Sequence, residues 1–126
     1  MKIRRASLRD FLGIKKLIKE YPDTLLQKHL PKPSEFFVAI ENGKIIGCCA
    51  LVIYSKRLGE IRSLAVSKDF QRQGIATALI DACIVFAKKK DIYELLSVTG
   101  VPALFDKHGF GTFNKEKFAL LKVLKD

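Results

Sequence analysis

Residues 71–76 read Gln71-Arg-Gln-Gly-Ile-Ala76, and they lie between two different apolar patterns. The apolar run from Ile61 to Val66 is typical of a strand, whereas Ile75 to Lys89 has helical spacing. A strand, a glycine-bearing turn and a helix start together form an anion site, because the first N–H groups of a helix have no partner within it and the helix dipole adds positive charge there. Gly74 and the small Ala76 leave room for a ligand close to the backbone. The stretch therefore predicts a site for a phosphate or pyrophosphate.

A longer stretch around this turn resembles the acetyl-CoA-binding segment of the GNAT N-acetyltransferase superfamily. It reads Glu60-Ile-Arg-Ser-Leu-Ala-Val-Ser-Lys-Asp-Phe-Gln-Arg-Gln-Gly-Ile-Ala-Thr-Ala-Leu79. The family signature is Gln or Arg, two residues, Gly, one residue, then Gly or Ala, and Gln71, Gly74 and Ala76 satisfy it. The resemblance runs from Ile3 to about Phe110 and implies a GNAT fold with acetyl-CoA as co-substrate.

Length and composition suit one domain over residues 1–126, because the chain is short and 48% apolar. No apolar run approaches the roughly 20 residues that span a bilayer. The N-terminus lacks the apolar stretch of a signal peptide, so we expect a cytoplasmic protein without a membrane partner. Cys48, Cys49 and Cys83 show no metal-ligand spacing, and their odd number argues against a disulfide framework. We expect buried thiols and no metal.

The formal net charge is +10, from 23 Lys and Arg against 13 Asp and Glu. Such a balance can indicate a nucleic-acid partner, but the positive residues are spread along the chain and no nucleic-acid motif accompanies them. We therefore expect no nucleic acid. The charge is either a solvated basic surface or an attraction for a polyanionic cofactor or an acidic substrate.

The order of elements predicts an α+β fold with a GNAT-like central sheet, mixed but mostly antiparallel, flanked by helices. Asn42-Gly43 is a strong hairpin signal. A helical crossover joins the strands before and after residues 75–89, so this pair should be parallel, with a cofactor entering where the strands part. In the GNAT family such a splayed parallel pair forms the acetyl-CoA cleft. The predicted strands are 2–6, 35–40, 44–54, 60–66, 92–98 and 118–123, and the predicted helices run from a Ser7–Asp10 capping box to about Tyr21, then 24–30, 75–89 and 102–107.

The resemblance assigns most cofactor contacts to the backbone. The amide of Leu64 would stabilise the oxyanion, and residues 64–66 would pair with the pantetheine arm as a further strand does. Arg72 and Gln73 would hold the pyrophosphate through N–H groups, helped by the Arg72 charge. The residues assigned to the cofactor are Leu64, Ala65, Val66, Gln71, Arg72, Gln73, Gly74, Ile75, Ala76 and Thr77.

Acetylation of an amine by a thioester needs a base for the amine, a donor for the oxyanion and a route for the thiolate to leave. Glu60 is the candidate base, because glutamate occurs at the matching position in GNAT enzymes that use a glutamate base; the alternative is an exposed glutamate at a strand end. Many members carry a Tyr four residues before a Gly-Phe pair near the C-terminus, where this chain has Phe105 before Gly109-Phe110. Phe cannot give a proton, so the thiolate leaves without a side-chain acid or is protonated by Tyr93, His108 or water.

A narrower resemblance concerns the acceptor. Residues 43–51, 59–66 and 104–110 look like N-acetylglutamate synthase acetyltransferase domains, closest to the stand-alone domains. Arg62 alternates with Glu60 on one strand face, where it could clamp a carboxylate beside the base. Arg57 lies near the place where that subgroup has a basic substrate-binding residue.

Two departures weaken the glutamate assignment. Gly100 replaces the arginine that two-domain synthases carry after this strand, and the usual Leu-Pro ending is absent from residues 116–124. The acceptor is therefore glutamate, another small amine or amino acid, or a protein lysine or N-terminus. A non-catalytic module that binds CoA or a partner protein is the competing class, and we also allow for a homodimer.

Overall fold

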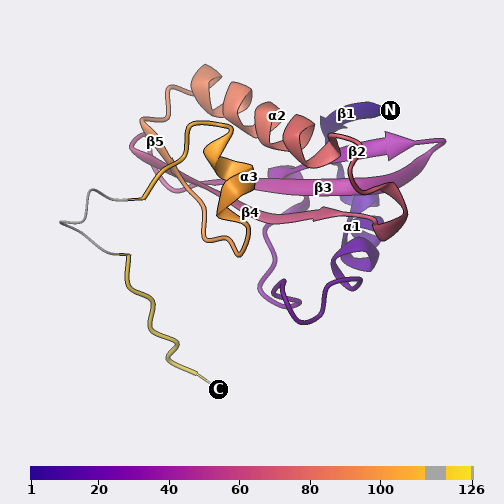
Figure 1. Cartoon of the computed structure of the whole chain (residues 1–126), viewed down its shortest axis with the longest axis horizontal. Helices are drawn as coiled ribbons and strands as arrows, with labels where there is room; N and C mark the ends of the chain where they lie inside the picture. Colours follow the sequence, from indigo (N-terminus) through magenta and orange to yellow (C-terminus); the bar gives the residue numbers. More distant parts are fainter. Residues whose placement is uncertain (113–118, 126) are drawn as a thin grey trace.

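A five-stranded sheet forms the centre of the computed structural model, which describes residues 1–112 and 119–125 (Figure 1). The strands lie side by side in chain order, and β1 to β4 pair antiparallel whereas β4 and β5 are parallel. The predicted mixed sheet and its parallel pair are confirmed. The strands are β1 (Lys2–Arg5), β2 (Phe36–Glu41), β3 (Lys44–Ile53), β4 (Leu58–Val66) and β5 (Glu94–Leu96).

Helices cover both faces of this sheet (Figure 1). The short α1 (Phe11–Ile18) packs on one face, and α2 (Ile75–Lys89) packs on the other together with α3 (Pro102–Asp106). In the described part of the chain, no helix is both long and apolar enough to cross a membrane. Three 3₁₀ turns complete the regular structure: η1 (Leu8–Asp10), η2 (Pro33–Glu35) and η3 (Lys68–Phe70).

Each sheet face has its own apolar layer, because neighbouring strand residues point to opposite sides. Cys48 packs with Ile14 and Ile18 of α1, whereas Cys49 packs with Leu79 of α2 and with other residues of that face. The three cysteines are buried and unpaired, as expected from the sequence. Burial raises the pKa of Cys48 to about 12, so this thiol is a core residue rather than a nucleophile.

The hairpin between β2 and β3 follows the sequence signal. Asn42 and Gly43 both have positive φ, 49° and 74°, as the two-residue turn that matches the strand twist requires.

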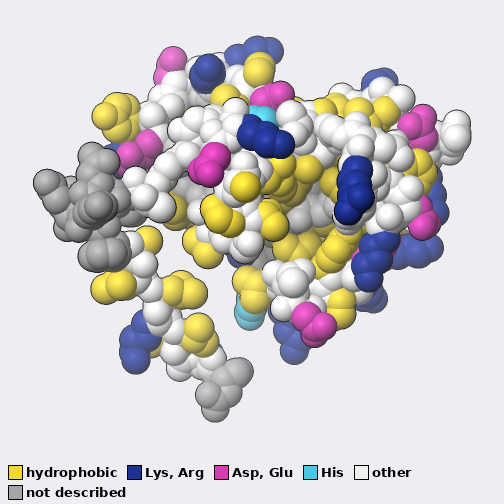
Figure 2. Space-filling model, in the orientation of Figure 1, with side chains coloured by type: hydrophobic (Ala, Val, Ile, Leu, Met, Phe, Trp, Pro, Cys, Tyr) yellow, Lys and Arg dark blue, Asp and Glu magenta, His cyan; other side chains and the backbone are white. Residues whose placement is uncertain are grey.

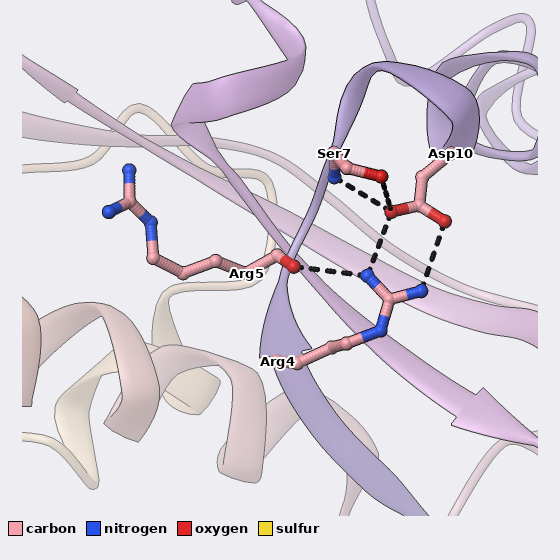
Figure 3. A network of polar contacts seen from close by, with 4 residues as sticks. All are labelled: Arg4, Arg5, Ser7 and Asp10. Atoms are coloured by element: carbon pink, nitrogen blue, oxygen red, sulfur yellow. Dashed lines mark hydrogen bonds and ion pairs between the residues drawn. The ribbon is translucent and has the colours of Figure 1, made fainter.

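A buried carboxylate fixes the start of the first helical segment (Figure 3). Asp10 accepts two hydrogen bonds from the Arg4 guanidinium, at 2.8 and 3.1 Å, and one from the Ser7 backbone N–H at 2.7 Å. The Arg4 hydrogen bonds hold the pKa of Asp10 well below its usual range. The carboxylate thereby joins β1 to η1, and the predicted Ser7–Asp10 capping box is formed.

Two helix predictions fail after residue 18. The first helix ends at Ile18 rather than near Tyr21, and residues 24–30 form turns and bends rather than a helix. Side-chain hydrogen bonds replace the helical ladder here: the Gln27 amide donates to the carbonyls of Ile18, Tyr21 and Leu25.

Two strand predictions also differ. The fifth strand pairs only over Glu94–Leu96, rather than over 92–98, because the chain then diverges from β4. Residue 118 lies outside the described residues, and residues 119–123 form no strand; Leu120, Leu121 and Val123 are exposed.

Candidate active site

A cleft of about 970 Å³ opens where β4 and β5 part. The last paired residues are Glu60 and Leu96. The residue after β5, Ser97, donates its hydroxyl to the Ile61 carbonyl oxygen at 3.2 Å. Beyond that bond the two chain segments diverge, and both line the cleft. Figure 2 shows a hollow on this face, with hydrophobic side chains in its floor and Lys and Arg side chains at its rim. The predicted splay of a parallel pair is thus present.

The cleft is lined by nearly all the residues that the sequence assigned to the cofactor. Residues 61–66 of β4 form one wall, and residues 74–77 at the start of α2 form the end. The opposite wall comes from residues 97–101, α3 and Lys107, and a third side comes from the loop after α1. The assigned residues that line it are Leu64, Ala65, Val66, Gln71, Arg72, Gly74, Ile75, Ala76 and Thr77; Gln73 does not.

A β-bulge shapes the β4 wall. Arg62 pairs with Ala50 and Ala65 pairs with Cys48, so one β3 residue faces two residues of β4, Ser63 and Leu64. Ser63 has a positive φ of 54°. Such a bulge bends the strand and frees backbone groups from the ladder, here at the residue predicted to supply the oxyanion donor. No Gly or Pro marks the bulge, so sequence reasoning missed it.

The helix start has the geometry that the sequence predicted for an anion site. Gly74 precedes α2 with φ of 78°, a conformation that glycine adopts without strain. A Cβ built on Gly74 would meet no atom within 4 Å, because it would point into open space. Arg72 also has a positive φ, of 63°. The turn therefore presents backbone and the N–H groups of a 15-residue helix to the cleft.

A tyrosine that the sequence reasoning missed completes this end of the cleft. The Tyr21 hydroxyl donates to the Val66 carbonyl at 2.6 Å, and the Gln71 amide donates to both the Tyr21 oxygen and the Val66 carbonyl. The Glu20 carboxylate also accepts a hydrogen bond from the Lys68 backbone N–H at 3.0 Å. These bonds fasten the loop after α1 to the turn that precedes α2. The only sequence signal was an aromatic residue just before Pro22.

The structure brings together two of the three polar residues proposed for catalysis and acceptor binding. Arg62 lines the cleft, and Glu60 lies two residues before it on β4 without lining the cleft itself. The Tyr54 hydroxyl donates to Glu60 Oε1 at 2.5 Å. Arg57 lies elsewhere: it is exposed and forms an ion pair with Glu94 at 3.2 Å, and it does not line the cleft.

The substitutes proposed for the missing acid do not reach the cleft either. Phe105 lines it, as the comparison with the usual Tyr position predicted. Tyr93 is 80% exposed outside it, and His108 has its ring Nδ1 2.9 Å from Asp81 of α2. The hydroxyls that do line the cleft belong to Tyr21, Thr24, Ser63, Thr77, Ser97 and Thr99. Within residues 1–112 and 119–125, no group of three metal-ligating side chains comes together.

A splayed parallel pair, a bulged strand and a helix start thus open on one cleft in an α+β fold. The model of the acetyltransferase (GNAT) family matches residues 2–110. The chain belongs to this family, and it is an N-acetyltransferase by class.

Known proteins of this class resemble the chain over most of its length. An amino-acid acetyltransferase of Mycobacterium tuberculosis is 34% identical over 86% of this chain and 67% of its own length. The crystal structure of Rv2747 from the same organism, in complex with CoA, superposes with a TM-score of 0.84 at 32% identity, over 90% of this chain and 74% of that one. The N-acetylglutamate synthase of Neisseria gonorrhoeae, complexed with CoA and N-acetyl-glutamate, gives 0.79 at 29% identity, over 93% of this chain and 30% of that one. The expected fold is confirmed, and the expected co-substrate agrees with the CoA in both structures.

Proposed function

We propose that this protein transfers the acetyl group of acetyl-CoA directly to the amine of a small acidic amino acid, with glutamate as the leading acceptor. The observation that carries the proposal is the position of Arg62. It lines the cleft on the same strand as Leu64, Ala65 and Val66, so a bound carboxylate would lie beside the acetyl group. The similarity to an amino-acid acetyltransferase and to an N-acetylglutamate synthase supports the same acceptor class.

Acetyl-CoA fits the cleft in size and polarity. The N–H groups at residues 71–76 and the Arg72 charge suit the pyrophosphate. The pantetheine arm, which carries amides, can pair with the cleft-side edge of β4 after Glu60, where β5 no longer pairs with it. The thioester would then lie near Leu64, whose N–H is the proposed oxyanion donor.

Glu60 is the proposed general base. It accepts the proton of the acceptor ammonium, directly or through a water, because the lone pair of the neutral amine must attack the thioester carbon. The tetrahedral intermediate collapses as its carbon–sulfur bond breaks. The leaving CoA thiolate takes a proton from water or from the nitrogen that was just acetylated, since no acidic side chain replaces the usual Tyr at Phe105.

A thiol-release assay with an amine panel tests the proposal. The panel contains L-glutamate, L-aspartate, L-glutamine, L-lysine, spermidine and a peptide with a free N-terminus, each with acetyl-CoA at saturation. We expect the two acidic amino acids to be the best acceptors. Glu60→Gln should reduce turnover by about 10²–10⁴ with little change in acetyl-CoA affinity. A non-catalytic CoA-binding module would release no thiol with any acceptor, and a preference for the peptide would indicate protein N-terminal acetylation.

A further inference from the structure

The polar group that touches Glu60 most closely is the phenol of Tyr54, which neither the family signature nor the cleft assigns to the reaction. Its oxygen lies 2.5 Å from Glu60 Oε1. Tyr54 directly follows β3, and Glu60 lies opposite Val52 in the same strand pair, so the two side chains are diagonal neighbours on one sheet face.

The backbone of Tyr54 is held independently of its side chain. Its N–H donates to the Leu58 carbonyl at 3.0 Å, and the Ser55 hydroxyl accepts from the N–H groups of Arg57 and Leu58 at 3.1 and 3.2 Å. The turn between β3 and β4 therefore does not need the phenol for its shape. The Tyr54 side chain is 54% exposed, so its contribution to the core is small.

The charges around Tyr54 and Glu60 keep the Tyr54 phenol protonated, so that it can donate a hydrogen bond. Hydrogen bonding to the Glu60 carboxylate raises the pKa of Tyr54 above its ordinary value, and Arg62 on the same strand partly opposes this effect. The other nearby charges, Arg57 and Glu94, neutralise one another at the starts of β4 and β5. At neutral pH the phenol keeps its proton and donates a hydrogen bond to the carboxylate.

We propose that Tyr54 is a positioning residue for the general base: its hydroxyl holds Glu60 Oε1 and leaves Oε2 to receive the proton of the acceptor. This inference rests on the proposed role of Glu60. The bond fixes the Glu60 rotamer on the strand face that Glu60 shares with Arg62.

The chain supplies a matched pair of variants for the test. Tyr54→Phe removes only the hydroxyl. Tyr93→Phe removes a hydroxyl from another exposed tyrosine, 80% accessible, whose backbone bond to the Lys56 carbonyl is unaffected. Both variants should unfold at the temperature of the wild type, because neither hydroxyl lies in the core.

The decisive measurement is ¹³C NMR at neutral pH with label in the glutamate carboxyl groups. The Glu60 signal is assigned by its loss in Glu60→Gln, so no acceptor is needed. In Tyr54→Phe we expect the chemical shift of the Glu60 carboxyl carbon to change, because the hydrogen bond to Oε1 is lost. Tyr93→Phe should leave this signal where the wild type has it.

Kinetics with the best acceptor of the panel give a second readout. In Tyr54→Phe turnover should fall about tenfold, with the acetyl-CoA KM unchanged, whereas Tyr93→Phe should turn over as the wild type does. Equal turnover in wild type and Tyr54→Phe would overturn the inference while leaving Glu60 as base. Full activity of Glu60→Gln would instead remove the base itself, so the two failures are distinguishable.

Discussion

The Tyr21 hydroxyl lies 2.6 Å from the Val66 carbonyl oxygen, and this bond joins the loop after α1 to the last residue of the cleft strand. The next residue, Ser67, donates its N–H back to Ile46 on β3 at 2.8 Å. Because successive strand residues direct their backbone groups to opposite sides, the Val66 carbonyl and N–H face away from β3. Tyr21 and Gln71 satisfy this carbonyl from within the protein, so Val66 offers its N–H to a ligand.

Removing this bond should weaken cofactor binding. In Tyr21→Phe the Val66 carbonyl keeps only the longer bond from Gln71, at 3.3 Å. We expect CoA affinity to fall about two- to tenfold, the cost of one net hydrogen bond, measured by isothermal calorimetry. Tyr93→Phe is the control, because its hydroxyl lies outside the cleft. Unchanged affinity in Tyr21→Phe would mean that the bond shapes the free protein without serving the cofactor.

A side chain at position 74 should block the pyrophosphate end of the cleft. Gly74→Glu places a carboxylate in the open space where no atom lies within 4 Å of a built Cβ, and it strains a backbone at φ of 78°. We expect a loss of several kcal/mol in CoA binding, since charge-assisted hydrogen bonds are lost and repulsion is added. Gly111→Glu provides a control outside the cleft. Equal CoA affinity of Gly74→Glu and the wild type in calorimetry would remove this site.

The Asp10 carboxylate should stabilise the fold at neutral pH. Asp10 is 7% exposed, and in Asp10→Asn the charged partner of Arg4 is lost. We expect the free energy of unfolding in urea to fall by about 1.5–3 kcal/mol at pH 7. The exposed Asp23→Asn should change little.

The difference in the free energy of unfolding between wild type and Asp10→Asn should decrease as the pH falls. The pKa of Asp10 is lowered in the folded protein by the Arg4 hydrogen bonds, so the unfolded chain takes up its proton first as the pH falls. The difference between wild type and Asp10→Asn should be full above about pH 5 and should shrink progressively below about pH 4. A difference that stays constant down to pH 3 would contradict the role of the charge.

The sequence predicted the site's backbone better than its side chains. Gly74 and the pattern of residues 75–89 carry strong local signals, so the turn and the bounds of α2 are confirmed. The bulge at Ser63 and the bond from Tyr21 to Val66 depend on pairings between distant segments, which a single sequence does not reveal. The ion pair of Arg57 was missed for the same reason, because its partner Glu94 comes from a strand that joins β4 only in the folded sheet.

Arg62 should determine the preference for an acidic acceptor. It lines the cleft two residues after Glu60, where its guanidinium can bind an acceptor carboxylate. In Arg62→Ala we expect the KM for L-glutamate to rise about tenfold or more, because a charge-assisted pair of roughly 1.5–3 kcal/mol is lost. The acetyl-CoA KM should stay the same, and the KM for an acceptor without a second carboxylate should rise less.

Arg57→Ala is the matched control for this prediction. It removes a second arginine, just before β4, that is paired with Glu94 outside the cleft, so the KM for glutamate should not change. Gly100 lies in the opposite wall of the cleft, where related synthases carry an arginine, so we expect the wild-type affinity for glutamate to be weak. Gly100→Arg should therefore lower the KM for glutamate. A wild-type preference for lysine or spermidine over glutamate would contradict the acidic acceptor, and Arg62 would then serve the cofactor or the sheet.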